Sequence, residues 1–215
     1  MSDAPRPLAS ATRRAAVVGV ALMGTGAASA QPATYPSDVA LGPANARVTL
    51  IEYASVMCGH CAHFHHEVWP QLKANYIDTG RIRFVLREIP TEPVQVAVAG
   101  FQIARCQSAT AEQYFSRVGA VFENQPAIFA STTMAELRDH LIRIGADAGL
   151  SEAQTMTCIT DPAGAERIRE TVIQAQSEWG AFGTPLLVLN GQRLTDPAAL
   201  TYDGLARILD AALAG

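Results

Sequence analysis

The chain has 215 residues, of which 49% are hydrophobic and 17% charged, and it carries a net charge of −4 at pH 7. These values are typical of one globular domain with a sizeable core, and they exclude a disordered or fibrous chain. Because the sequence has no basic stripe, we expect no nucleic-acid partner.

The first 30 residues are expected to be a secretory signal peptide. Arg13-Arg14 precede an apolar run, and the small residues Ala28-Ser29-Ala30 end it, which is the order found before a cleavage site. The run over residues 15–30 is shorter than the ~20 residues that cross a bilayer, so we expect cleavage after Ala30. The arginine pair resembles a twin-arginine signal, and the choice between that route and the Sec route stays open. The chain would then reach the periplasm with a net charge of −6, since three Arg and one Asp are removed.

The next elements follow in chain order. Residues 31–46 are rich in Pro and Gly and are expected to be an extended lead-in without a core of its own. Residues 47–54 are apolar at both odd- and even-numbered positions, as in a strand buried on both faces. A helix kinked at Pro70 is predicted over residues 58–76, and a second strand over residues 81–89.

Residues 94–176 have a helical pattern almost throughout, with capping boxes at Thr133–Glu136 and Ser151–Gln154. This stretch is too long for a simple crossover, so it predicts a helical insert. A strand over residues 186–189, the turn Asn190-Gly191 and a helix over residues 200–213 complete the chain. The predicted fold class is therefore α/β, with one domain over residues 47–215 that carries the helical subdomain.

The run Cys58-Gly59-His60-Cys61 places two thiols one helical turn apart, where a buried strand gives way to a helix. The free N–H groups at a helix N-terminus stabilise a thiolate, so Cys58 should have a lowered pKa and act as the nucleophile. Cys61, one turn further in, would resolve the mixed disulfide. His60 would stabilise the thiolate further and make the disulfide more oxidising.

Of the nearby histidines His63, His65 and His66, the last two lie close enough in sequence to supply ligands, so a structural zinc site is the alternative for such a pair. A tetrahedral site needs ligands from more than one direction, and the sequence has no second Cys-x-x-Cys or Cys-x-x-His. We therefore expect redox chemistry with no metal and no other cofactor. For the three histidines we expect surface or packing roles.

Two further positions are ambiguous from the residues alone. Glu52 lies in an apolar strand, six residues before Cys58. It is either a carboxylate at the strand edge or a buried group that takes the proton of Cys61. Pro185 comes just before a strand, and its spacing alone predicts a trans bond, because only about 5% of X-Pro bonds in folded proteins are cis.

The strand with its acid, the Cys-x-x-Cys pair, the long helical insert and Thr184-Pro185 before a hairpin together resemble the DsbA-like family of thiol–disulfide oxidoreductases. Residues 52–55, 58–65 and 76–80 look like the branch common in α-proteobacteria. The resemblance covers residues 45–213 and implies a thioredoxin-like fold with an inserted helical subdomain.

By this likeness Cys58 is the attacking cysteine, Cys61 the resolving one and Glu52 a buried proton relay. Pro185 would be a cis-proline whose loop lies against the active site, and Thr184 would supply the backbone contact to the substrate. The likeness further implies an oxidase that acts on unfolded or newly exported cysteine-containing proteins and is reoxidised by a DsbB-like membrane partner.

The sequence departs from the best-known oxidases at Gly59, where they carry Pro, and at Thr184, where they often carry Val. Cys-Gly-His-Cys is also the motif of protein disulfide isomerase, so an isomerase or reductase stays open. The dedicated bacterial isomerases add an N-terminal dimerisation domain, for which residues 31–46 are too short, and we therefore expect a monomer. A zinc-holding binding protein is the alternative outside the enzymes.

Cys106 and Cys158 fall in the predicted insert, 52 residues apart. In an oxidising compartment we expect them to form a disulfide that pins the first helix of the insert to its end; two buried free thiols are the alternative. Some α-proteobacterial relatives of the DsbA-like family carry a second bridge, which favours the disulfide.

Overall fold

The computed structural model describes Met1 and residues 34–215, and within these residues five strands form one mixed sheet. The predicted signal peptide lies almost wholly outside the described residues. The sheet has the strand order β1-β3-β2-β4-β5, in which β2 and β3 are parallel and the other neighbours antiparallel. The strands are β1 (Val39–Leu41), β2 (Thr49–Ala54), β3 (Arg83–Glu88), β4 (Leu186–Leu189) and β5 (Gln192–Arg193).

Strand β1 lies inside the segment that we predicted as an extended lead-in. It pairs with β3 from Val39 opposite Leu86 to Leu41 opposite Phe84, and Tyr35 just before it is only 4% exposed. The Pro and Gly residues on both sides of this three-residue strand are typical of a loop, so the sequence did not predict it. The lead-in therefore contributes an edge strand to the sheet.

Strand β2 is buried along its whole length, as its composition predicts. Leu50 and Ala54 belong to the larger hydrophobic core, whereas Ile51 and Tyr53 belong to a smaller core on the opposite face. Because side chains alternate along a strand, Glu52 points to the same face as Leu50. That face is the one that carries the first helix.

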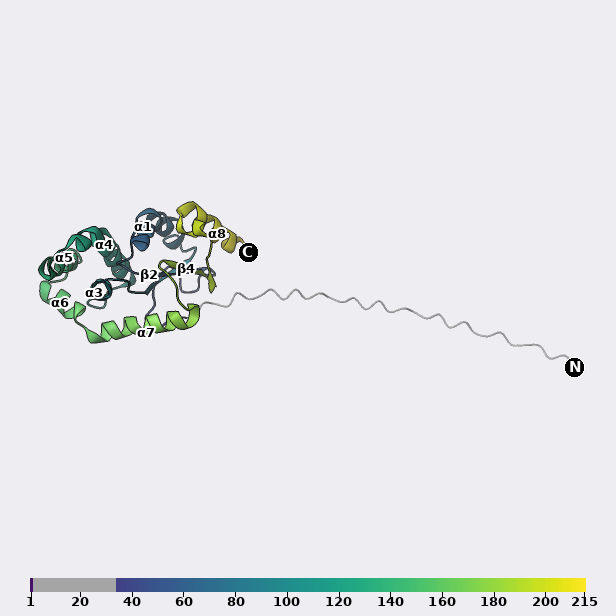
Figure 1. Cartoon of the computed structure of the whole chain (residues 1–215). Coiled ribbons are helices and arrows are strands. Elements are labelled where there is room, and N and C mark those ends of the chain that lie inside the picture. Colours follow the sequence, from purple (N-terminus) through teal and green to yellow (C-terminus); the bar gives the residue numbers. More distant parts are fainter. Residues whose placement is uncertain (2–33) are drawn as a thin grey trace.

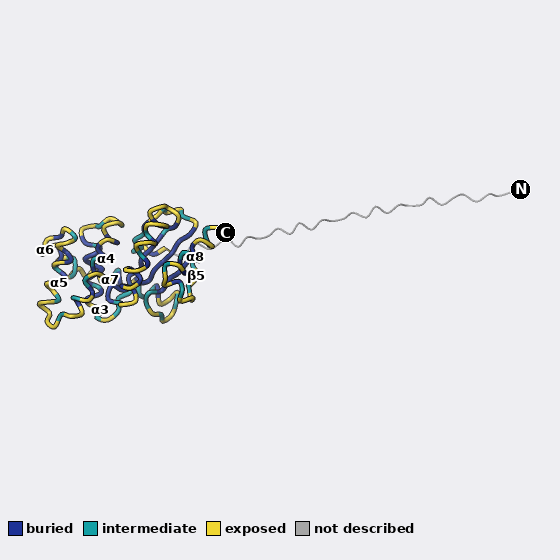
Figure 2. Tube along the Cα trace, turned by 90° about the horizontal axis from the view of Figure 1, so that it is seen from above, coloured by how far each residue is buried: buried dark blue, intermediate teal, exposed yellow. Residues whose placement is uncertain are grey.

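The helices cover both faces of the sheet (Figure 1). Helices α1 and α8 lie on one face and α7 on the other, and α3 to α6 stack beside the sheet as a separate layer of helices. Buried residues lie at the centre of both the sheet region and the layer of helices beside it (Figure 2). No helix within residues 34–215 is both long and apolar enough to span a bilayer. The helices are α1 (Gly59–Glu67), α2 (Trp69–Leu72), α3 (Val94–Arg105), α4 (Ala111–Ala130), α5 (Met134–Asp147), α6 (Glu152–Ile159), α7 (Pro162–Trp179) and α8 (Tyr202–Ala214).

The long helical stretch has two locations in the fold. The capping boxes at Thr133 and Ser151 are present, and a third at Thr110 begins α4. Helix α7, however, packs on the sheet through Ala175 and Trp179. The other main contacts of α7 are divided between β3 of the sheet and α3 of the helical stretch.

The predicted helix over residues 58–76 is interrupted, as Pro70 suggested. Helix α1 ends at Glu67, Val68 separates it from α2, and a short π-helical segment (Lys73–Ile77) continues the chain. Pro70 has no N–H to donate to the turn before it, and the chain restarts as a new helix with Pro70 in its first turn.

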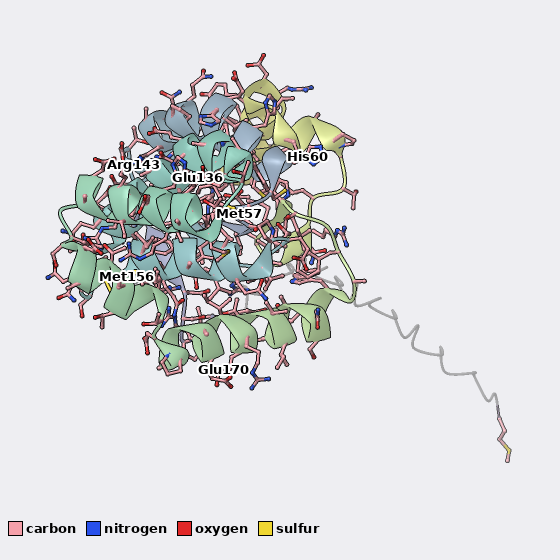
Figure 3. All side chains as sticks on the ribbon, turned by 60° about the vertical axis from the view of Figure 1, so that its left-hand side comes forward. Met57, His60, Glu136, Arg143, Met156 and Glu170 are labelled. Atoms are coloured by element: carbon pink, nitrogen blue, oxygen red, sulfur yellow. A yellow bond between two sulfur atoms is a disulfide. The ribbon has the colours of Figure 1, made fainter. Side chains whose placement is uncertain are left out.

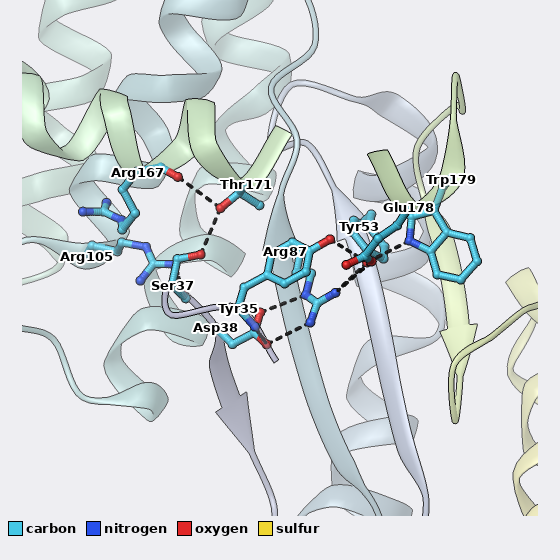
Figure 4. A network of polar contacts seen from close by, with 10 residues as sticks. All are labelled: Tyr35, Ser37, Asp38, Tyr53, Arg87, Arg105, Arg167, Thr171, Glu178 and Trp179. Carbon is cyan, nitrogen blue, oxygen red and sulfur yellow. Dashed lines mark hydrogen bonds and ion pairs between the residues drawn. The ribbon is translucent and has the colours of Figure 1, made fainter. Parts of the chain in front are cut away.

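A polar network ties the lead-in, β2, β3 and the end of α7 together on the smaller core (Figure 4). The hydroxyl of Tyr53 accepts hydrogen bonds from Arg87 at 2.6 Å and from Trp179 Nε1 at 2.9 Å, and it donates to Glu178 at 3.3 Å. Arg87 also binds both carboxylate oxygens of Asp38. The network fixes the end of α7, from which the chain runs into the loop that holds Pro185.

Candidate active site

The loop between β2 and α1 presents Cys58 at the end of the helix. Cys58 is the N-cap residue of α1, with extended backbone angles, and its N–H donates to Ser55 O at 3.1 Å. Two neighbouring segments hold this loop: Thr91 N–H donates to Ser55 Oγ at 3.0 Å, and Gln125 Nε2 donates to Val56 O at 2.9 Å. The reactive end of the helix is therefore fixed before any substrate binds.

The thiol of Cys58 is half-buried, and its pKa is lowered to about 5. The largest cause is the hydrogen bond from the Cys61 thiol; burial opposes it, and a hydrogen bond from Thr184 and the backbone N–H groups of Cys61 and His60 assist it. The direction of the shift is the one that we expected for Cys58, and the N–H groups of the helix N-terminus are among its smaller causes. Cys58 is thus ionised at neutral pH.

His60 contributes its backbone N–H to this stabilisation, and its side chain is exposed. Figure 3 shows His60 close to the start of α1 and Met57 just before the helix, with Met156 on the other side of the molecule. The role expected for the His60 imidazole therefore stays a prediction.

Cys61 differs from Cys58 in both its burial and the direction of its pKa shift. It is fully buried, and burial is the first cause that raises its pKa well above the ordinary value of a thiol. Its hydrogen bond to Cys58 and the charge of Glu52 raise the pKa further. The two thiols of the pair therefore have opposite preferences, one for the thiolate and one for the protonated form.

A second loop, 126 residues later in the chain, completes the site. The Thr184-Pro185 peptide bond is cis, as the family resemblance implied, and the sequence spacing alone gave the wrong isomer. Strand β4 follows Pro185 and pairs with β2, with Leu187 opposite Glu52, which brings the loop over Cys58. Cys58 Sγ lies 3.3 Å from Thr184 O. A second cis bond, Glu92-Pro93, was not foreseen from the sequence.

Glu52 is the buried group of the two alternatives that the sequence left open. It is 0% exposed, and its Oε2 lies 2.9 Å from Nε2 of His65. Its other oxygen, Oε1, is buried and has no hydrogen-bond partner among the described residues. Glu52 lies near enough to Cys61 for its charge to act on the thiol.

His65 is the residue whose position sequence reasoning missed. We expected surface or packing roles for the three histidines, and His63 and His66 are exposed, but His65 is buried against Glu52. The signal was available: His65 follows Cys61 by four residues, so both lie on the same side of α1. That side packs on the sheet face that carries Glu52.

The zinc alternative requires histidines that converge with the cysteines. Within residues 34–215, no three His, Cys, Asp or Glu side chains are placed to hold a metal ion. His65 instead uses one ring nitrogen for a carboxylate.

The remaining two cysteines form a disulfide, as predicted, with their Sγ atoms 2.01 Å apart. Cys106 is the C-cap of α3 and Cys158 lies in α6. The expectation that the bridge reaches the end of the insert was wrong, because α7 follows Cys158 and adds 18 residues. The bridge links α3 to α6.

The thioredoxin family model matches residues 34–211. A Rickettsia typhi protein named "Putative protein-disulfide oxidoreductase" is 29% identical over 182 residues, which are 82% of this chain and 62% of that protein. A Rickettsia conorii protein of the same description is 31% identical over 156 residues, 72% of this chain and 54% of its own length. The chain therefore spans less than two thirds of the curated relatives it matches.

The crystal structure of Wolbachia pipientis alpha-DsbA1 superposes with a TM-score of 0.70 at 26% identity. The match covers 84% of this chain and 93% of that chain. This agreement confirms the predicted thioredoxin-like fold with an inserted helical subdomain.

Proposed function

The chain belongs to the DsbA-like family of thioredoxin-like proteins, and on this premise we propose that it is an exported oxidase that transfers the Cys58–Cys61 disulfide to newly exported proteins. The observation that carries the proposal is the opposite shift of the two thiol pKa values, low for Cys58 and high for Cys61.

The transfer follows from this asymmetry. A substrate thiolate attacks Cys58 Sγ, the Cys58–Cys61 bond breaks, and its electron pair stays on Cys61, which takes up a proton because its pKa is high. A second substrate thiolate then attacks the substrate sulfur of the mixed disulfide. Cys58 leaves as a stable thiolate, since its pKa is about 5. The substrate gains one disulfide, and the enzyme pair gains two electrons.

We assign roles in this reaction to the other predicted site residues, Glu52, Thr184 and Pro185. Glu52, with Oε1 unpaired among the described residues, exchanges a proton with Cys61. Thr184 and Pro185 form the edge along which an extended substrate chain pairs its backbone next to Cys58. An extended chain suits this edge because it offers N–H and C=O groups at strand spacing.

An oxidase fits the site better than an isomerase or a reductase. A thiolate of low pKa stabilises the reduced form of the pair and so makes its disulfide a stronger oxidant. The pKa of about 5 at Cys58 lies well below the ordinary value of a cysteine, about 8.5. The Cys106–Cys158 bridge further supports an oxidising compartment such as the periplasm.

The equilibrium of the Cys58–Cys61 couple with glutathione tests the proposal. We expect a potential nearer to that of DsbA, about −120 mV, than to that of thioredoxin, about −270 mV. The matched assay is the oxidation of a reduced, unfolded protein. A membrane fraction with a DsbB-like, quinone-linked protein serves as the reoxidant. Sedimentation of the purified chain tests whether it is a monomer. A couple near −270 mV would identify a reductase, and tightly bound zinc in the purified protein would identify a binding protein.

A further inference from the structure

His65 occupies a position between the buried site and solvent. Its side chain is only 4% exposed, and Nε2 lies 2.9 Å from Glu52 Oε2 on the inner side. On its outer side His65 lines a cavity of about 380 Å³ between α1, α2 and α4. The imidazole is therefore in contact with both the buried carboxylate and an open space.

Aromatic neighbours fix the orientation of this ring. Trp69 stacks on it with the ring centres 5.4 Å apart, and Phe122 packs against it at 4.4 Å. Both also line the cavity. Because the ring is held on two sides, it keeps Nε2 on Glu52 while the cavity remains beside it.

The buried cysteine needs a proton supply in both directions of thiol–disulfide exchange. Cys61 gains a proton when the pair is reduced and must lose it when the pair is reoxidised, yet it is 0% exposed. Glu52 is equally buried, so it must also exchange its proton with another group after each turnover. Among the described residues, His65 is the hydrogen-bond partner of its carboxylate.

We propose that His65 carries protons between Glu52 and the solvent of this cavity. On reduction of the pair, Cys61 takes its proton from Glu52, Glu52 regains one across the hydrogen bond from His65, and His65 is reprotonated by water. Reoxidation runs in the opposite order. His65 acts through Glu52 and does not touch sulfur, and the inference rests on the proposed thiol–disulfide exchange.

Among the titratable and charged groups that line the cavity, His65 is the one that contacts Glu52. These groups come from three elements. Lys73 forms ion pairs with Asp78 at 2.6 Å and with Glu112 at 3.5 Å. The titratable and charged side chains that line the cavity besides His65 are His66 of α1, Lys73 of the π-helical segment, and Glu112 and Glu123 of α4.

The test separates two steps of the reaction of the full, reduced chain with oxidised glutathione. Rapid quenching in acid resolves the attack of Cys58, which forms the glutathione mixed disulfide, from the closure by Cys61, which needs deprotonation. We expect His65→Gln and His65→Ala to leave the first step unchanged and to slow closure by roughly a hundredfold or more, the usual range of proton-transfer catalysis. The control His63→Ala, which changes an exposed histidine of the same helix, should close at the parent rate.

Chemical rescue distinguishes proton transfer from a structural role. Imidazole added to His65→Ala should restore closure, because the vacated space is continuous with the cavity, and it should fail in the double variant with Glu52→Gln. Parent-like closure in His65→Gln, or no rescue of folded His65→Ala, would overturn the inference. If His65→Ala does not fold, His65→Gln decides: closure that accelerates with buffer concentration supports the inference, and closure independent of buffer overturns it. A failure of the first step in the parent would instead refute the proposed function.

Discussion

Cys58 Sγ lies 3.3 Å from the carbonyl oxygen of Thr184, a residue 126 positions later in the chain. This contact joins the thiolate site at the start of α1 to the loop of the cis Thr184-Pro185 bond. A substrate held along that loop would place its cysteine beside the sulfur that it attacks. The predictions below begin with that sulfur.

Cys58→Ser should abolish disulfide transfer, because within the described residues the other free thiol, Cys61, is fully buried. Cys61→Ser should instead accumulate mixed disulfides with substrates, since it lacks the resolving thiol. Non-reducing gels after acid trapping report both results: transfer is followed with a reduced substrate protein, and trapping with a substrate that already holds a disulfide, which the Cys58 thiolate of Cys61→Ser attacks. Sustained turnover by Cys58→Ser would contradict the site assignment.

The reactivity of Cys58 should titrate with a midpoint near pH 5, where its thiolate forms. Because its folded pKa is depressed, the stability that it gives the reduced protein is complete above the unfolded value of about 8.5 and is lost as the pH falls through about 5. Alkylation rates and denaturant unfolding of the reduced form between pH 4 and 9 measure both effects. Cys61→Ala should move the alkylation midpoint upward, since the Cys61 thiol is the largest cause of the low pKa. A parent midpoint near pH 8.5 would contradict this account of the site.

His60→Ala should make the couple less oxidising, by roughly 10–30 mV, if the imidazole stabilises the thiolate as its place between the cysteines suggests. The exposed His63 on the same helix provides the control, and His63→Ala should leave the potential unchanged. Glutathione equilibration measures all three proteins. Equal potentials would assign the effect at position 60 to its backbone N–H alone.

Removing the second disulfide with Cys106→Ala and Cys158→Ala together should lower the melting temperature while disulfide transfer persists. The loop closed by the bridge spans 52 residues, and the chain-entropy estimate for such a loop is ~4 kcal/mol, an upper figure for the loss. The bridge joins the end of α3 to α6, and neither cysteine belongs to α1 or to the Thr184-Pro185 loop. Thermal unfolding and transfer rates of the double variant and the parent test this. Unchanged stability would argue against a structural role, and lost transfer in a folded protein would place chemistry at this pair.

Tyr53→Phe should destabilise the protein by about 1–3 kcal/mol, the usual cost when buried donors lose an acceptor. The hydroxyl accepts from Arg87 and Trp179 in the network of Figure 4, and Tyr53 is 0% exposed. Tyr202→Phe is the matched control, because the Tyr202 hydroxyl accepts from Asn75 at the surface. Denaturant unfolding should separate the two variants clearly, and equal losses would show that the buried network adds no stability.

Local patterns in the sequence determined the strand–loop–helix that presents Cys58, the interruption near Pro70 and the capping boxes of α5 and α6. Each of these depends on contacts within a few residues, which the order of side chains specifies directly. The direction of the Cys58 pKa shift was also predictable, since its largest cause is the thiol of Cys61, three residues away, and backbone N–H groups of the same helix assist it.

The tertiary structure decided the features that depend on residues far apart in the chain. The sequence could not choose between an exposed and a buried Glu52, because its environment comes from α1 packing on the sheet. Neither could it place Thr184 on Cys58, which requires β4 to pair with β2 across more than 120 residues. The strand β1 and the His65–Glu52 contact emerged for the same reason: a short segment or a single side chain acquires its partner only when the sheet and its helices are assembled.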